Sequence, residues 1–157
     1  MTMETMKEHQ IIRLSPEEFG KCGNIWDMER HKAQAEEWRR QLIAGDRITF
    51  VYLLEGQFIG EISLVHTHPD PDYTIPGRRA YISRLVVKPE FRRRGIGKTL
   101  VRFISEKAAE LGYTELSIGV DLDNCPAIRL YAEEGFDRIL RVDRDEQGTY
   151  MKLLKIR

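Results

Sequence analysis

The segment RRRGIGKT, at residues 92–99, constrains the fold of this chain more than any other stretch. The β-rich run AYISRLVV (80–87) precedes it and stops before Pro89, because proline cannot donate a hydrogen bond to a strand ladder. From Gly97 to Leu111 the apolar residues recur with helical spacing. Glycines between a strand and a helix let the backbone turn tightly, so that several N–H groups point one way beside the positive end of the helix dipole. The segment therefore predicts a strand–turn–helix that binds a pyrophosphate without a metal.

The glycine turn differs from two other phosphate-binding motifs. A nucleotide-triphosphate P-loop requires a glycine at the position of Arg92. A dinucleotide-binding turn requires a third glycine after Gly95 and Gly97, where this chain has Leu100. The remaining alternative is that Gly95 only permits a turn and that the neighbouring arginines are solvated. We favour the pyrophosphate interpretation, because three arginines and Lys98 add positive charge at the helix start.

Apolar periodicity and turn signals predict a mixed α/β chain. The expected strands are 10–14, 47–54, 57–66, 80–87 and 114–120, with a closing hairpin made by FDRILRV and TYMKLLKI, and the expected helices start at Ser15 and span 28–44, 97–111 and 125–135. This order predicts an α/β (α+β) fold with a mixed, mostly antiparallel sheet of about six or seven strands flanked by helices. The length predicts a single domain, 1–157, and the predicted elements place its core at about 10–155.

The composition narrows the classes of partner. Lys plus Arg and Asp plus Glu number 25 each, so the chain lacks the basic excess of proteins that coat nucleic acid or anionic membranes. The first ten residues have no apolar core of a signal peptide, and apolar runs are too short to span a bilayer. Cys22 and Cys125 do not form a CxxC pair. We expect a cytoplasmic protein with no nucleic-acid or membrane partner, and a homodimer is the default expectation for its oligomeric state.

Two motifs together resemble one protein family. Arg92-x-x-Gly95-x-Gly97, after a strand and opening a helix, resembles the acetyl-CoA motif of the Gcn5-related N-acetyltransferase (GNAT) superfamily. The segment VDLDNCPAIRLYAEEGF (120–136) resembles the second half of the same family, in which a strand, an Asn, a short helix, a Tyr and Gly-Phe follow one another. The resemblance implies the acyl-CoA N-acyltransferase fold with splayed central strands. It also implies acetyl-CoA as co-substrate and an amine as acceptor.

The resemblance assigns acetyl-CoA contacts to two stretches of the chain. The backbone of the 85–87 strand would pair with the pantetheine arm, the N–H groups of 93–99 would hold the pyrophosphate, and Asn124 would hydrogen-bond the arm. The implied cofactor-binding residues are Leu85, Val86, Val87, Arg92, Arg93, Arg94, Gly95, Ile96, Gly97, Lys98, Thr99, Asn124, Ala127 and Tyr131. Asn is also a common helix cap, so Asn124 has a structural alternative that does not exclude the first.

The chemistry of acetyl transfer requires an oxyanion donor, a proton for the leaving thiolate and a neutral amine. The backbone N–H of Val87 is the expected oxyanion donor. Tyr131 is the expected general acid, because a phenol is protonated at neutral pH and is close to a thiol in acidity. The alternative for Tyr131 is a helix aromatic that only covers the core. We favour the catalytic role because of the residues that surround it.

The general base is open. Many family members carry a carboxylate early in the fourth strand, where this chain has Tyr81. Glu61 on the preceding strand is a possible base, and Ser83, or His66 or His68 acting through a water, are further alternatives. The amine could also arrive already neutral.

No metal is expected. The segment HTHPDPD (66–72) has a His-x-His pair and two aspartates, but without further spaced ligands it is more typical of a polar loop.

The acceptor-binding site would be formed by residues 15–45, by residues 66–79 and by the final hairpin, and no motif in these segments identifies the acceptor. We therefore predict an N-acetyltransferase that moves an acetyl group from acetyl-CoA to a primary amine of a small molecule or peptide in a ternary complex. The alternative is a catalytically silent acyl-CoA sensor or interaction domain.

Overall fold

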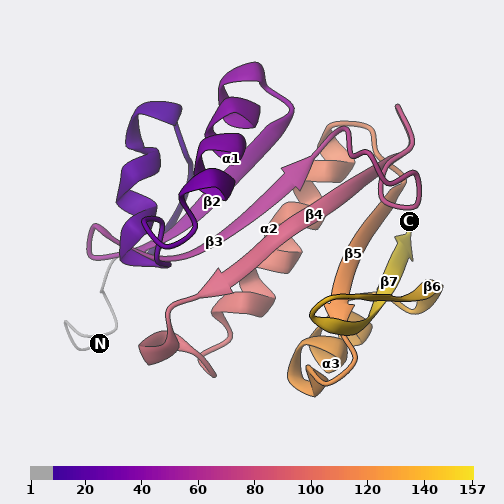
Figure 1. The fold of residues 1–157 in the computed structure, drawn as a ribbon. Helices are drawn as coiled ribbons and strands as arrows, with labels where there is room; N and C mark the ends of the chain where they lie inside the picture. The colour runs from indigo at the N-terminus through magenta and orange to yellow at the C-terminus, as the bar shows by residue number, and fades with distance from the viewer. Residues whose placement is uncertain (1–8) are drawn as a thin grey trace. The chain divides into compact units, whose positions relative to one another are not determined.

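The computed structural model describes residues 9–157 (Figure 1). The elements are β1 (His9–Arg13), η2 (Pro16–Asn24), α1 (Lys32–Ala44), β2 (Arg47–Leu54), β3 (Gln57–Val65), β4 (Arg79–Val87), η3 (Pro89–Phe91), α2 (Ile96–Glu110), β5 (Glu115–Asp121), α3 (Cys125–Glu133), β6 (Arg138–Asp145) and β7 (Gly148–Ile156). The strands form one seven-stranded sheet in the order β1-β2-β3-β4-β5-β7-β6. The predicted fold class and element order are confirmed.

The first predicted helix is a 3-10 helix, η2. Pro16 occupies the first helical position as expected, but the Ser15 hydroxyl donates to the Glu18 carboxylate instead of capping the backbone. Gly20 and Gly23 lie within this segment and disfavour a regular α-helix, because glycine loses the most backbone freedom on ordering. Three further bounds differ: α1 begins at Lys32 rather than at 28, α3 ends at Glu133 rather than at 135, and β6 runs from Arg138 to Asp145 rather than over FDRILRV. The short 3-10 turn η3 was not predicted.

The expectation that the chain has no signal peptide depends largely on residues 1–8, which lie outside the described residues. Between residues 9 and 157, no helix is both long and apolar enough to cross a bilayer.

The chain forms two compact units. Unit 1 comprises the residues up to Ser63 together with Arg84–Leu100, and unit 2 comprises Leu64–Ser83 together with Val101–Arg157. Each unit is made of two chain segments, and both β4 and α2 pass from one unit into the other. The units are described separately below.

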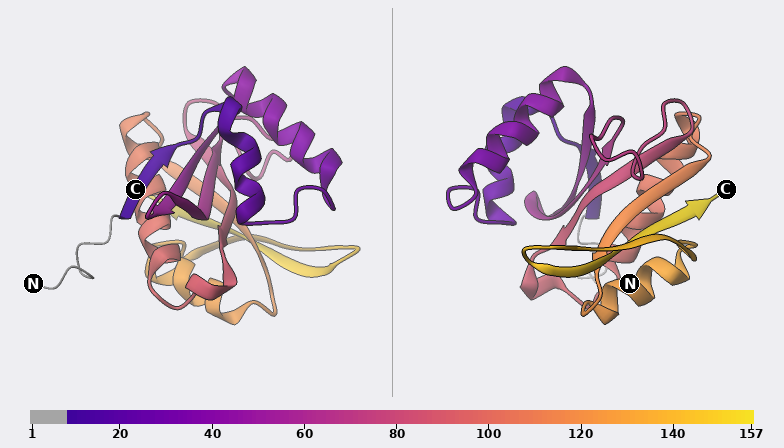
Figure 2. Two further views of the ribbon diagram at one scale, coloured as in Figure 1. Left: turned by 90° about the vertical axis from the view of Figure 1, so that its left-hand side faces the viewer. Right: turned by 45° about the vertical axis from the view of Figure 1, so that its right-hand side comes forward.

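In unit 1, η2 and α1 lie side by side and pack on the sheet (Figure 2). Beneath them is a core of buried side chains: Leu14, Phe19, Cys22, Ile25, Ala35, Leu42, Val51 and Phe58. Trp26, Trp38 and Val86 pack against this core and are only partly buried. The core of unit 1 therefore packs against the C-terminal half of β4, at Val86.

In unit 2, β4 pairs in parallel with β5, and the other strand pairs are antiparallel. The β4–β5 pairing covers Arg79–Ile82 and Glu115–Ile118 and then ends, as expected for central strands that splay. The β6–β7 hairpin is long and twisted (Figure 2), with an irregularity between Ile139 and Arg141. The parallel pair fixes the start of β4 and the start of β5 next to each other.

Candidate functional site

The predicted pyrophosphate turn lies in unit 1, between η3 and α2. Gly95 has a φ of 79° and Arg93 a φ of 65°, so two residues of this short turn are left-handed. A left-handed residue beside a right-handed one directs successive N–H groups toward one side, which is the backbone geometry that binds anions. The helix α2 then begins at Ile96, and the first four N–H groups of an α-helix have no partner within the helix.

Buried side chains anchor the start of α2 on the sheet of unit 1. Ile96 and Leu100 are 5% and 0% exposed, and both approach the position of Gly60 on β3. A Cβ on Gly60 would lie 3.3 Å from the carbonyl oxygen of Val86, so β3 and β4 approach closely at this point. The turn is therefore held rigidly at the end of β4.

The side chains of the turn are partly engaged with their own segment. The Arg92 Nε donates to the Val87 carbonyl at 3.0 Å, and the Arg94 guanidinium lies 5.2 Å from the centre of the Phe91 ring. The Thr99 hydroxyl donates to the Gly95 carbonyl at 2.9 Å, so it would have to turn away to donate to a phosphate. The main chain of the turn is thus better placed than its side chains to bind an anion.

The Val87 N–H points away from β3. The Lys88 N–H donates to the Ile59 carbonyl of β3 at 2.8 Å, and successive residues of a strand direct their N–H groups to opposite sides. The Val87 carbonyl, on the same side as its N–H, accepts from Arg92. The Val87 N–H therefore lies on the side of β4 that does not pair with β3, and its role as oxyanion donor stays a prediction.

Glu61 lies on β3 and is 4% exposed. It pairs with Arg84 of β4, with 3.9 Å between the Arg84 Nε and the Glu61 Oε1. Burial raises the pKa of Glu61 to about 7, although Arg84, Arg47 and the nearby Trp26 indole N–H each lower it. A carboxyl group with a pKa near neutrality can take up and release a proton at physiological pH.

The Arg84 guanidinium is enclosed by the two tryptophans of the chain. It lies 4.7 Å from the centre of the Trp26 ring and 5.1 Å from that of Trp38, and the two rings meet edge to face. Burial is the main cause that lowers the pKa of Arg84, and the Glu61 charge opposes it. We refer to Glu61, Arg84, Trp26 and Trp38 as the Trp–Arg–Glu cluster.

A surface groove of about 770 Å³ adjoins this cluster in unit 1. Trp26 and Met28 form part of its apolar lining, and Asp27, Glu29 and Glu36 supply carboxylates, alongside basic side chains from α1. The groove falls within the 15–45 stretch that was expected to shape the acceptor site.

In unit 2, Asn124 caps α3. Its side-chain Oδ1 accepts from the Ala127 N–H at 3.3 Å, which is the structural alternative that the sequence left open. Ala127, an expected cofactor-binding residue, therefore uses its N–H in this cap. The Asn124 side-chain amide NH₂ is not part of this bond, so the cap leaves its donor capacity to other partners.

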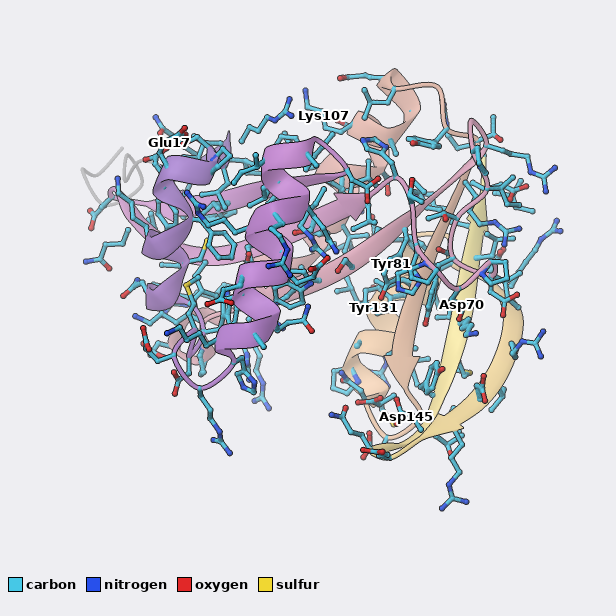
Figure 3. All side chains as sticks on the ribbon, turned by 45° about the horizontal axis from the view of Figure 1, so that its top comes forward. Glu17, Asp70, Tyr81, Lys107, Tyr131 and Asp145 are labelled. Atoms are coloured by element: carbon cyan, nitrogen blue, oxygen red, sulfur yellow. The ribbon has the colours of Figure 1, made fainter. Side chains whose placement is uncertain are left out.

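Tyr131 lies on α3 of unit 2 and is 6% exposed. Burial raises its pKa to about 12, and the proximity of Tyr81 adds to that effect. The Tyr131 ring also packs edge to face on Phe136, with ring centres 6.0 Å apart. Figure 3 shows Tyr81 and Tyr131 in the same part of the unit. The phenol is therefore protonated at neutral pH, which is the state that a general acid requires.

Tyr81 belongs to an aromatic group with His68 and Tyr73. The Tyr73 and Tyr81 rings stack with centres 4.2 Å apart, and His68 meets each of them edge-on at 5.0 Å. The backbone N–H of Asp70 donates to the His68 Nδ1 at 2.9 Å, so the proton of the neutral ring is on Nε2. In this tautomer His68 is a donor toward its neighbours and not a base.

The remaining base alternatives are differently placed. His66 bonds through Nδ1 to the Tyr113 hydroxyl. Ser83 is half-buried on β4. Among the four side chains considered as bases, Glu61 is the buried carboxyl group, and burial raises its pKa to about 7.

The aspartates of the 66–72 segment bind a lysine. The Lys152 Nζ, on a side chain that is 4% exposed, lies 2.6 Å from Asp70 Oδ2 and 3.0 Å from Asp72 Oδ2, and Asp72 also pairs with Arg141. Within 9–157, no group of three or more His, Cys, Asp or Glu is arranged to hold a metal ion. These ion pairs tie the long loop before β4 to the closing hairpin.

Sequence reasoning missed Arg84 and the position of Tyr73. A Cβ on Gly119 of β5 would lie 2.7 Å from the Tyr73 hydroxyl, so the missing side chain at 119 makes room for that ring. The signals were one charge within the apolar run ISRLVV and one glycine within the strand ELSIGV. Neither signal identifies its partner, because both partners are distant in the sequence.

The fold and the turn define a class of protein with a splayed mixed sheet, in which a central strand leads into a glycine turn and a helix. Residues 9–136 match the profile of the Acetyltransferase (GNAT) family. The match covers most of the chain and includes both motifs, and the chain belongs to this family.

Individual relatives agree with the family match. The chain is 37% identical over 98 residues, 62% of its length, to N-alpha-acetyltransferase 30 of Dictyostelium discoideum, and the match covers half of that protein. It is 28% identical over 142 residues to thialysine N-epsilon-acetyltransferase of Sus scrofa, which covers 80% of this chain and 82% of that protein. The crystal structure of the PaiA N-acetyltransferase of Thermoplasma acidophilum in complex with coenzyme A has the same fold, with a TM-score of 0.70, 20% identity and coverage of 96% and 99%.

Proposed function

We propose that this protein is an N-acetyltransferase that transfers the acetyl group of acetyl-CoA to a primary amine of a small molecule or peptide. The observation that supports the proposal is the turn after β4, where two left-handed residues precede the start of α2 in a chain of the GNAT family, a backbone geometry suited to bind an anion. The complex of the Thermoplasma neighbour with coenzyme A supports the choice of cofactor.

Acetyl-CoA would bind through the main chain of β4 and of the turn. The N–H groups of 93–99 would hold the pyrophosphate, aided by the dipole of α2 and by the charges of the turn. The backbone of Leu85, Val86 and Val87 would pair with the pantetheine arm. The donor capacity of the Asn124 amide supports its predicted contact with the same arm.

The reaction would proceed by direct attack. The neutral amine forms a C–N bond to the thioester carbonyl carbon, whose oxygen becomes an oxyanion, and the orientation of the Val87 N–H supports its role as donor to that oxyanion. When the C–S bond breaks, the thiolate takes the proton of Tyr131, which is protonated at neutral pH. The nitrogen loses its proton to a base, for which we propose Glu61.

The acceptor is proposed only as a class. The names of the two relatives refer to alpha and epsilon nitrogen atoms, which supports a primary amine. The carboxylates of Asp27, Glu29 and Glu36 along the groove of unit 1 support a cationic amine as acceptor.

For the location of the protein we propose the cytoplasm, which the two free cysteines support.

A release assay for coenzyme A with a library of amines and peptides tests the proposal. We expect turnover with at least one member, and a Tyr131→Phe variant should lose most of kcat while its affinity for acetyl-CoA is kept, because the ring stays in place and only the proton donor is removed. Equal turnover of the Tyr131→Phe variant would contradict the role of Tyr131.

A catalytically silent acyl-CoA sensor is the second candidate. It is favoured by Tyr81, which occupies the position where many family members carry a carboxylate. Stabilisation of the protein by acetyl-CoA in a thermal unfolding assay, together with no release of coenzyme A for any library member, is the result expected of a sensor. Turnover with any amine excludes it.

A further inference from the structure

Tyr73 lies in the loop before β4, and its hydroxyl is placed against the backbone of β5 in unit 2. A Cβ on Gly119 would lie 2.7 Å from the Tyr73 hydroxyl oxygen, so this oxygen occupies the space that a side chain at position 119 would fill. The Ser117 hydroxyl donates to the Tyr73 carbonyl at 2.6 Å, and side chains two residues apart on a strand share a face. The phenol is therefore held over one defined point of β5.

Gly119 is the first residue of β5 beyond its pairing with β4. The last residues that pair are Ile82 of β4 and Ile118 of β5, and the ladder then ends. The Tyr73 hydroxyl thus lies where the two central strands begin to splay. In the proposed function the thioester of acetyl-CoA is bound between these strands, and the inference below rests on that function.

The Tyr73 hydroxyl has the capacity to bind a ligand. Tyr73 is 7% exposed, and no residue between 9 and 157 forms a hydrogen bond with its hydroxyl, although buried phenols usually have a partner. The hydroxyl oxygen is not among the unbonded side-chain atoms that are fully buried, so solvent reaches it. Burial raises the pKa of Tyr73, so the phenol keeps its proton at neutral pH and can both donate and accept a hydrogen bond.

The groups around Tyr73 fix its orientation and connect it to the expected general acid. The Tyr81 ring stacks on the Tyr73 ring with centres 4.2 Å apart, and the His68 ring meets it edge-on at 5.0 Å. The Lys152 Nζ lies 5.3 Å from the centre of the Tyr73 ring. Tyr81 is also close enough to Tyr131 to contribute to its raised pKa. Tyr73 and Tyr131 are therefore both neighbours of Tyr81, one in the loop before β4 and the other on α3.

We propose that the Tyr73 hydroxyl binds the nitrogen of the acceptor amine and is a catalytic residue of the acetyltransferase, and that Gly119 makes room for this contact. The phenol oxygen accepts one N–H of the amine, which leaves the nitrogen lone pair available to attack the thioester carbonyl carbon. The C–N bond forms and the C–S bond breaks, while Tyr73 keeps its own proton. The proton that the nitrogen loses and the proton that the sulfur gains are those already assigned to the base and to Tyr131.

Tyr73→Phe is the first test, with an amine that the coenzyme A release assay identifies as an acceptor. The ring and its stacking remain while the oxygen is removed, so KM for the amine should rise about tenfold, the effect of one hydrogen bond, and Kd for acetyl-CoA should stay unchanged. Tyr52→Phe is the matched control, because Tyr52 is a similarly buried tyrosine whose hydroxyl is bonded to His9, and it should leave KM unchanged. An unchanged KM in Tyr73→Phe overturns the proposal.

Gly119→Ala separates amine binding from packing. The added Cβ displaces the Tyr73 oxygen, so KM for the amine should rise in this variant as well. In the double variant of Gly119→Ala and Tyr73→Phe the clash is removed, so stability should recover in part, whereas KM should stay raised because the oxygen is still missing. A KM that recovers together with the stability means that Tyr73 acts through packing alone, and it overturns the proposal.

A binding measurement that needs no turnover uses the unaltered protein with its six tyrosines isotope-labelled at the ζ carbon. In NMR spectra, n-propylamine added as the probe in the presence of coenzyme A should shift the Tyr73 signal, which the Tyr73→Phe variant identifies by its absence. The Tyr52 signal should stay in place. No shift of the Tyr73 signal at any concentration of n-propylamine overturns the proposal.

The kinetic and the binding measurements together separate this site from the proposed function. A shift of the Tyr73 signal without release of coenzyme A for any amine leaves Tyr73 as an amine-binding residue and removes the acetyltransferase. Release of coenzyme A with the same KM in the unaltered protein and in Tyr73→Phe leaves the acetyltransferase standing and removes Tyr73 from its mechanism.

Discussion

At residue 119 the structure leaves no room for a side chain. A Cβ on Gly119 would come within 2.7 Å of the Tyr73 hydroxyl, and the Ser117 hydroxyl holds the Tyr73 backbone with a 2.6 Å bond to its carbonyl, so the ring cannot easily retreat. We expect Gly119→Ala to lower the free energy of unfolding by about 1–3 kcal/mol, the usual cost of overpacking, as measured by urea unfolding. Tyr73→Phe removes the clashing oxygen, so the double variant should recover part of the loss. If Gly119→Ala leaves the free energy of unfolding unchanged, the Tyr73 hydroxyl does not restrict the side chain at position 119.

Gly95 differs from Gly119, because its cost of substitution is conformational. A Cβ at Gly95 meets no protein atom within 4 Å, but its φ of 79° is left-handed. Gly95→Ala should therefore lower stability by roughly 1–2 kcal/mol and weaken acetyl-CoA binding in calorimetry, because an alanine there favours a turn with redirected N–H groups. Gly20→Ala, at a glycine that also has open space and no positive φ, is the control. Unchanged affinity of Gly95→Ala for acetyl-CoA would argue against the turn as the phosphate site.

At the scale of elements, α3 depends on its cap. Asn124 accepts from the Ala127 N–H, and the loss of an N-cap typically costs about 1 kcal/mol. We expect Asn124→Ala to lower stability by that amount and also to weaken acetyl-CoA binding, whereas Asn124→Asp keeps the cap and removes the amide donor. Asn124→Asp should therefore retain stability and lose affinity. Retained affinity in a stable Asn124→Asp variant would assign Asn124 to the cap alone.

The elements that the sequence predicted well are those whose periodicity is local. The strands β2 to β4 and the helix α2 each have a run of apolar residues at one spacing, and their observed bounds differ from the predicted ones by no more than a residue or two. The segment Pro16–Asn24 has a good helix start, but its two glycines favour a 3-10 helix, and a start signal does not reveal how the helix continues.

Some residues of the candidate site could be named from the sequence and others could not, because only some of them lie in contiguous motifs. The turn at 92–99 and the Tyr131 helix are contiguous motifs, so their residues could be named from the sequence. Glu61 and Arg84 are single charges within two separate apolar strands, and Trp26 comes from a loop. Only the packing of these elements brings the three together, and it decides that Glu61 is buried beside a cation and a ring N–H.

At the scale of the whole molecule, buried charge has opposite consequences for stability in the two units. Asp70 and Asp72 of unit 2 have a lowered pKa beside Lys152, which holds them as carboxylates, so the stability that they contribute is lost only as the pH falls below their ordinary range. Glu61 of unit 1 has a raised pKa, so the stability that its protonated form contributes is lost as the pH rises toward neutrality. The acid side of the stability profile therefore reports on unit 2 and the neutral range on unit 1.

Stability should fall as the pH rises from about 4.5 to about 7, because of Glu61. Below that window Glu61 is protonated in both states, and within it the unfolded chain loses the proton while the native protein keeps it, which favours unfolding. The shift from 4.5 to about 7 corresponds to a loss on the order of 3 kcal/mol in the free energy of unfolding, measurable by urea denaturation at pH 5 and pH 8. Glu61→Gln should flatten this dependence, and Glu36→Gln, at an exposed carboxylate on α1, should retain it. An equally steep dependence in Glu61→Gln would mean that another group takes up the proton, and that the buried carboxyl is already ionised in the native protein.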